Sequence, residues 1–149
     1  MIRPATKSDV PRLVEIGQEF FNMTELDNVT TYNLESVTNL LSNSIDDESS
    51  TVLVVELDGE IVGATGATIY PFYFNTDNRV AQEFFWYIAE THRGGLIGVK
   101  LFKALEMWAL ENGAQTMDMT ALGVNQRSVG QFYEKQGYYR QETHYMRRL

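Results

Sequence analysis

The chain has 149 residues, no cysteine, and 20 acidic against 12 basic residues, which gives a formal net charge of −8. That length fits one compact domain spanning residues 1–149, and an apolar content of 44% is enough to fill its core, so wholesale disorder is excluded. Without cysteine there is no disulfide framework, no thiolate metal site and no cysteine nucleophile.

The negative charge is concentrated in the first half of the chain. No Lys or Arg lies between Arg12 and Arg79, a stretch that carries 12 acidic residues. From Ile61 onward, 8 acidic and 9 basic residues nearly cancel. An acidic front half repels nucleic acid and anionic lipid, so we expect neither as a partner. It favours a cationic small molecule or a basic peptide, or it serves only as a solubilising surface.

The first half of the chain predicts a short strand, two helices and a hairpin. Residues 2–6 favour the opening strand, and apolar residues then recur at helical spacing over 10–21 and, more weakly, over 33–44. The polar run 46–50 indicates a loop. Two β-branched runs, 52–57 and 61–70, flank Asp58-Gly59, a dipeptide typical of tight hairpin turns. These runs therefore predict a pair of antiparallel strands.

The second half predicts further strands alternating with helices. Residues 71–79 form an expected loop that contains the aromatic trio Phe72, Tyr73 and Phe74, and the aromatic-rich run 81–89 favours a strand. A helix follows from Ile97 to Trp108 and is closed by Asn112-Gly113. A strand over 117–122, a helix over 126–136 and one or two strands over 138–149 complete the order. This order predicts an α/β domain of the α+β kind, with a mixed sheet.

A glycine-rich turn, Arg93 to Gly98, lies between the strand 81–89 and the following helix. N–H groups at a helix start have no intrahelical partner and the helix dipole is positive there, so such a turn is suited to binding phosphate. The glycines would let a ligand approach the main chain, and Arg93 adds a positive charge. The turn lacks the P-loop and dinucleotide-binding patterns, so alone it also fits an ordinary turn.

Three segments together resemble the GCN5-related N-acetyltransferases, the GNAT superfamily. They are the opening Ile2–Asp9, the strand and turn Trp86–Gly98, and the tail Val129–Tyr138. The likeness extends over nearly the whole chain and implies the GNAT fold. It also implies that the middle segment is the pyrophosphate loop of acetyl-coenzyme A (acetyl-CoA), written R/Q-x-x-G-x-G/A in that family. The aromatic strand and the Arg-Gly-Gly turn are similar to GNAT sequences from phage genomes.

The resemblance assigns the cofactor contacts to one strand and one loop. The strand would pair with the pantetheine amides through Tyr87, Ile88 and Ala89, and the loop residues would hold the pyrophosphate: Arg93, Gly94, Gly95, Leu96, Ile97 and Gly98. Leu96 departs from the family pattern, which has a glycine at that place. We expect its side chain to crowd the phosphates or tilt the loop, unless Gly94 and Gly95 restore the missing flexibility.

The resemblance implies that two residues near the last helix act on the cofactor. Tyr133 occupies the family's usual acid position, and a phenol with a pKa near 10 is suited to protonating a leaving thiolate; otherwise Tyr133 is a core aromatic. The family commonly places an Asn seven residues before this Tyr. Here Gln126 holds that place and Asn125 precedes it by one residue. We favour Asn125, because Asn is also the better N-cap.

Three residues are candidates for the base that deprotonates the acceptor ammonium. Glu83 leads, because many GNAT enzymes keep a Glu on this strand. Strand alternation would also place it on the face of Phe85 and Tyr87, where desolvation raises a carboxyl pKa. Glu90 and His92 are the alternatives, and each of the three is also compatible with an ordinary solvated side chain.

We therefore expect an acetyl-CoA-dependent N-acetyltransferase that acetylates a primary amine by direct attack. The acceptor, a small molecule or a peptide, is expected to be cationic and to lie over the acidic front half. His92 and His144 are 52 residues apart with no carboxylate at ligand spacing, so no metal is expected. A homodimer is compatible with the resemblance. Without a signal segment or the ~20 apolar residues of a membrane helix, a cytoplasmic location is expected. The alternative is a non-catalytic GNAT-fold module that binds coenzyme A or a basic protein.

Overall fold

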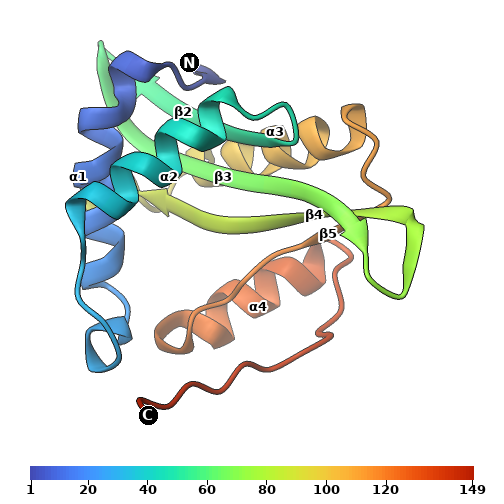
Figure 1. The fold of residues 1–149 in the computed structure, drawn as a ribbon. Helices are drawn as coiled ribbons and strands as arrows, with labels where there is room; N and C mark the ends of the chain where they lie inside the picture. The colour runs from blue at the N-terminus through green and yellow to red at the C-terminus, as the bar shows by residue number, and fades with distance from the viewer.

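Five strands form one sheet in the order β1-β2-β3-β4-β5 in the computed structural model, which describes all 149 residues (Figure 1). The first four pair antiparallel, and β5 joins β4 in parallel, so the expected mixed sheet is confirmed. Asp58-Gly59 closes the β2–β3 hairpin, as the sequence predicts. The strands are β1 (Ile2–Pro4), β2 (Ser50–Leu57), β3 (Glu60–Phe72), β4 (Asn75–Ile88) and β5 (Thr116–Asp118).

Four helices surround this sheet (Figure 1). Helices α1 (Val10–Asn22) and α2 (Leu34–Asp46) cover one face, and α3 (Ile97–Glu111) packs on the other. The fourth, α4 (Gln126–Lys135), follows β5 and lies below the sheet in the view of Figure 1. None of the four has the length and apolar content that a membrane-spanning helix needs.

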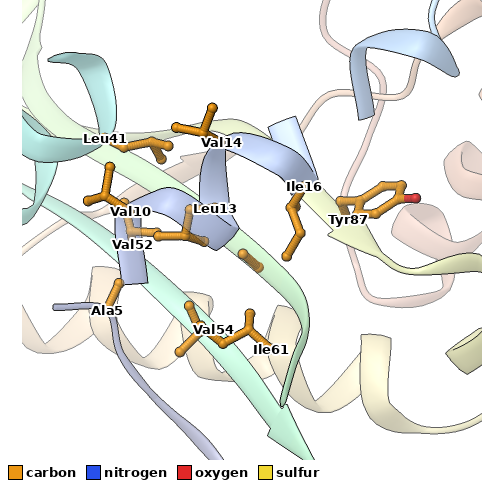
Figure 2. Packing of buried hydrophobic residues seen from close by; sticks show 11 residues of the cluster. Ala5, Val10, Leu13, Val14, Ile16, Leu41, Val52, Val54, Ile61 and Tyr87 are labelled. Atoms are coloured by element: carbon orange, nitrogen blue, oxygen red, sulfur yellow. The ribbon is translucent and has the colours of Figure 1, made fainter. Parts of the chain in front are cut away.

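The amphipathic pattern of α1 explains the largest of the three core clusters. Its apolar residues, three or four positions apart, point at the sheet and meet Leu41 of α2 (Figure 2). Tyr87 of β4 lies at the edge of this cluster, beside Ile16 (Figure 2). On the opposite face, Leu101 and Leu105 of α3 are fully buried against β2 and β3. Each additional apolar side chain buried in this way contributes about 1.5–3 kcal/mol before entropic costs.

A β-bulge interrupts the pairing of β4 with β3. Gly66 pairs with Phe85, but the next residue of β3, Ala67, pairs with Glu83, so Phe84 has no partner. The rings of Phe84 and Phe85 both pack on the α1 side, and a Cβ at residue 66 would overlap the Phe84 ring. Only glycine fits at that place. Because of this extra residue, the alternation of β4 side chains between the two faces of the sheet is out of phase before and after the bulge.

The loop expected over residues 71–79 is wrong in most of its length. Strand β3 continues to Phe72 and β4 begins at Asn75, so a long hairpin replaces the loop. Pro71 is tolerated because β3 extends past β2 here: the last β2 pairing is Ser50 with Thr68, and the missing N–H breaks no ladder bond. The aromatic trio lies at the hairpin tip, with ring centroids 4.3–5.8 Å apart.

The expected strands of the C-terminal part are shorter or absent. Strand β5 covers only Thr116–Asp118 of the predicted 117–122. Residues 138–149 form no strand, and from Tyr139 to the end all side chains are exposed. A strand needs a neighbour to pair with, and alternation of residue types alone supplies none. Helices α3 and α4 match their predicted spans closely, and Asn112 and Gly113 follow α3 as expected.

Candidate active site

The end of the β4–β5 pairing creates an open edge on β4. The two strands pair only where Val80–Gln82 meets Thr116–Asp118, so residues 83–88 have no β5 partner. On the other side, the Ala89 N–H donates to the Val62 carbonyl at 2.8 Å. This bond flanks the Gly63–Ile88 pair, whose own backbone groups therefore point away from each other. Ile88 thus presents its N–H and C=O to the open edge.

The residues expected to bind pantetheine differ in what they offer at this edge. Tyr87 alternates with Ile88, so its backbone groups face β3. The Ala89 N–H is bonded to β3, and its carbonyl accepts from the His92 N–H at 2.8 Å. Of the three, Ile88 alone has backbone groups on the open edge. By the same alternation, the backbone N–H and C=O of Trp86 also point to the open edge. Trp86 is identified only by the strand register, which the sequence does not show.

The loop after β4 leads into the start of α3. The first α3 bond runs from the Lys100 N–H to the Leu96 carbonyl at 2.9 Å, which leaves the N–H groups of residues 97–99 without a helical partner. Gly94 has φ = +85°, a conformation that glycine adopts without strain. Leu96 has an ordinary right-handed backbone, and its side chain is 72% exposed. The backbone at 96 therefore does not need the glycine of the family pattern.

Arg93 turns its side chain back toward the sheet. Its Nε donates to the Ile88 carbonyl at 2.7 Å, and its guanidinium carbon lies 5.0 Å from the centroid of the Tyr87 ring. Its Nη2 donates to the sulfur of Met23 at 2.9 Å. None of the ion pairs in the structure includes Arg93.

Glu83 is the first residue of β4 on the open edge, and it is 5% exposed. Its Oε2 accepts a hydrogen bond from the Thr120 N–H at 3.0 Å. Burial raises the pKa of Glu83 to about 7, against the opposing effect of this bond. The expectation that Glu83 shares a face with Phe85 and Tyr87 is wrong. Because of the bulge, Glu83 points to the α3 side while those two rings point to the α1 side.

Tyr133 of α4 also bonds to the main chain of Thr120. Its hydroxyl donates to the Thr120 carbonyl at 3.1 Å, and the side chain is buried. Burial, followed by the nearby Glu83 charge, raises the pKa of Tyr133 above its ordinary value, so the phenol stays protonated. Its ring packs in a cluster of aromatic side chains that fixes α4 to α3 and β4: Trp86, Phe102, Phe132 and Tyr138. Such pairs each contribute about 0.5–1.5 kcal/mol beyond burial.

Asn125 occupies the N-cap position of α4, as its residue type favours. Its side chain makes no capping bond, and its Oδ1 is buried with no hydrogen-bond partner. The indole Nε1 of Trp86 is the second buried side-chain atom without a partner. Gln126, the alternative to Asn125, is exposed as the first residue of α4. A buried acceptor that lacks a partner is compatible with contact to a bound ligand.

Neither of the two alternative bases bonds to Thr120. Glu90 and His92 are both exposed in the short turn that follows β4, and the His92 ring is bonded to the Thr91 hydroxyl at 2.9 Å. The structure therefore brings Glu83 and Tyr133 together and leaves Glu90 and His92 outside. No group of three or more His, Asp or Glu side chains is placed to ligate a metal ion.

Acidic side chains border the α1 side of β4. Arg12 forms ion pairs with Glu15 and Glu19, at 2.9 and 3.0 Å. The hydroxyl of Tyr87 donates to the other oxygen of Glu19 at 3.2 Å. Arg12, and Arg93 against the Tyr87 ring, are the cations beside these two carboxylates.

A family model for the GNAT acetyltransferases matches residues 13–138 of the chain. The chain belongs to this family. The match includes both the strand-to-helix turn after β4 and the tyrosine on α4. Members of the GNAT family use acetyl-CoA. A search of curated protein sequences finds no significant match to this GNAT protein.

Solved acetyltransferase structures share the fold of this GNAT protein. A ribosomal-protein-alanine N-acetyltransferase from Brucella melitensis biovar Abortus 2308 superposes with a TM-score of 0.75 at 18% identity, covering 100% of this chain and 99% of that one. An aminoglycoside acetyltransferase from an uncultured soil metagenomic sample, solved with sisomicin, gives 0.75 at 18%, covering 100% and 95%. A predicted acetyltransferase from Clostridium acetobutylicum, solved with acetyl-CoA, gives 0.76 at 19%, covering 100% and 94%. At these identities the likeness establishes the fold.

Proposed function

We propose that this GNAT protein transfers an acetyl group from acetyl-CoA to a primary amine, by direct attack of the amine. The observation that carries the proposal is the pair of bonds to Thr120. A buried carboxyl, Glu83, and a buried phenol, Tyr133, both bond its main chain where β4 and β5 stop pairing. A proton acceptor and a proton donor thus lie together beside the free edge of β4.

The cofactor fits three features of the chain. The unpaired N–H groups at the α3 start would hold the pyrophosphate, with Gly94 and Gly95 allowing close approach. The open edge of β4, with the Ile88 N–H and the backbone groups of Trp86, would pair with the pantetheine amides, and Asn125 Oδ1 supplies an acceptor that has no other partner. When bound, acetyl-CoA supplies an acetyl group activated as a thioester.

The two buried groups have complementary protonation states near neutral pH. With a pKa of about 7, Glu83 is largely a carboxylate in mildly alkaline solution and accepts a proton from the acceptor ammonium, directly or through water. Tyr133 keeps its proton and donates it to the thiolate that leaves. A direct attack needs no nucleophile from the enzyme.

The acceptor is proposed to lie over the acidic front half of the chain, with its amine reaching Glu83 at the open edge of β4. The 12 acidic residues between Arg12 and Arg79, a stretch without Lys or Arg, favour a cationic amine. Two fold relatives carry names that fit such acceptors, an aminoglycoside acetyltransferase and a ribosomal-protein-alanine acetyltransferase. The homodimer and the cytoplasmic location remain predictions.

Calorimetric titration with acetyl-CoA, followed by an acetyl-transfer screen, tests this function. The screen spans polyamines, aminoglycosides, amino acids and peptide N-termini, and we expect turnover to favour acceptors with several positive charges. Absence of acetyl-CoA binding would contradict the enzyme proposal. Binding without turnover on any acceptor would favour the non-catalytic module, and a preference for neutral amines would contradict the role of the acidic surface.

A further inference from the structure

Arg93 is the first residue of the glycine-rich loop after β4, and its side chain contacts three separate parts of the site. Through the bonds described above it contacts the carbonyl of Ile88 at the end of β4, the ring of Tyr87, and Met23, the residue that follows α1. The cofactor loop, the open strand edge and the α1 side are therefore held together by one guanidinium.

The bond to Ile88 satisfies a carbonyl that no strand reaches. Ile88 is 9% exposed, and its C=O points to the edge where β5 pairing has ended. A carbonyl left unbonded at such a place costs about 1–3 kcal/mol. The Arg93 Nε–H removes this cost at 2.7 Å and fixes the loop start relative to the strand end, five residues earlier.

The geometry uses the shape of the guanidinium as well as its charge. Its central carbon lies over the Tyr87 ring while two different nitrogens donate to an oxygen and a sulfur. A lysine ammonium has the same charge but neither a planar face nor donors fixed at two positions. No carboxylate is bonded to Arg93, so its contacts are to neutral groups only.

We propose that Arg93 is a positioning residue, which braces the end of β4 and the start of the loop in the arrangement that receives the cofactor. It acts through the Ile88, Tyr87 and Met23 contacts and not by placing its charge on a phosphate. The proposal rests on the proposed function of the loop as the coenzyme A site.

Titration of coenzyme A into Arg93→Lys and Arg93→Ala separates the brace from a charge effect. We expect both variants to lose affinity by about tenfold, equivalent to about 1.4 kcal/mol, with the same dependence of affinity on salt as the wild type. Lys100→Ala is the matched control, since it removes an exposed cation from the first turn of α3 whose side chain makes no hydrogen bond or ion pair. It should lower the salt dependence. The proposal is overturned if Arg93→Lys binds like the wild type while Arg93→Ala is weak and less sensitive to salt.

A measurement without ligand tests the brace independently of the loop's function. In protein labelled at its methionine methyl groups, the Met23 resonance, assigned with Met23→Leu, should shift in both Arg93 variants and stay in place in Lys100→Ala. An unchanged Met23 resonance in Arg93→Ala would refute the brace. If wild-type protein does not bind coenzyme A at all, the proposed function fails, and the methyl measurement still decides whether Arg93 holds the three elements together.

Discussion

Replacing Glu83 with glutamine tests the environment of this carboxyl through protein stability. Burial raises its pKa from 4.5 to about 7, so between these pH values the folded protein holds a proton that the unfolded chain has released. Stability therefore falls as the pH rises through this window, and glutamine, which does not titrate, removes the fall. At 1.36 kcal/mol per pKa unit, the free energy of unfolding of Glu83→Gln gains about 2.5 kcal/mol on the wild type between pH 5 and pH 8.

The assay is thermal or urea unfolding of both proteins at the two pH values. The quantity compared is how much the difference in unfolding free energy between the two proteins changes from pH 5 to pH 8, so any pH-independent cost of the amide cancels. A gain of about 2.5 kcal/mol corresponds to about 5–10 °C in Tm. Glu134→Gln is the matched control, because it makes the same substitution at an exposed position of α4. If the difference between Glu83→Gln and the wild type changes with pH no more than that of this control, the Glu83 carboxyl does not have the environment described above.

Three further substitutions test other features of the structure. Gly66→Ala should lower the free energy of unfolding, measured in urea, by about 1–3 kcal/mol, because its Cβ would overlap an aromatic ring. Gly123→Ala is the control, since nothing lies within 4 Å of the new Cβ, and an equal loss there would refute the overlap as the cause. Tyr133→Phe should reduce kcat by about 100-fold or more with the Kd for coenzyme A unchanged, and wild-type turnover would exclude it as the acid. Asp9→Asn should destabilise the protein at neutral pH, because the bond from Arg3 stabilises the Asp9 carboxylate and lowers its pKa. The loss of stability should shrink as the pH falls below 3.8, and an equal loss in acid would contradict this explanation.

Local patterns were sufficient to predict most of the fold. The apolar spacing of α1, the Asp58-Gly59 turn and the Asn112-Gly113 helix end are each set by neighbouring residues, and all three appear in the structure. The strand, glycine turn and helix around Arg93 are found where the family resemblance places them. The family resemblance also identifies Tyr133 and Glu83 as candidate site residues, and the structure brings both to Thr120.

The remaining features depend on contacts between distant parts of the chain. Alternation assigns Glu83 to the wrong face because the extra residue at Phe84 depends on how β3 pairs, and Gly66 gives no sign of this by itself. Proline and polar residues predicted a loop at 71–79, yet Pro71 is harmless once β3 has passed the end of β2. Trp86 could not be singled out, because the direction of its backbone groups follows from the register alone.

The attachment of Glu83 and Tyr133 to Thr120 has a consequence for sequence variation and for engineering. Both bonds use main-chain groups, and the residue itself is exposed. Substitutions at position 120 that keep the backbone conformation would leave both bonds in place, while proline would abolish one by removing the N–H. Among relatives, residues 83 and 133 would then be constrained while residue 120 varies freely. A designer could change the side chain at 120 beside Glu83 and Tyr133 without loosening either of them.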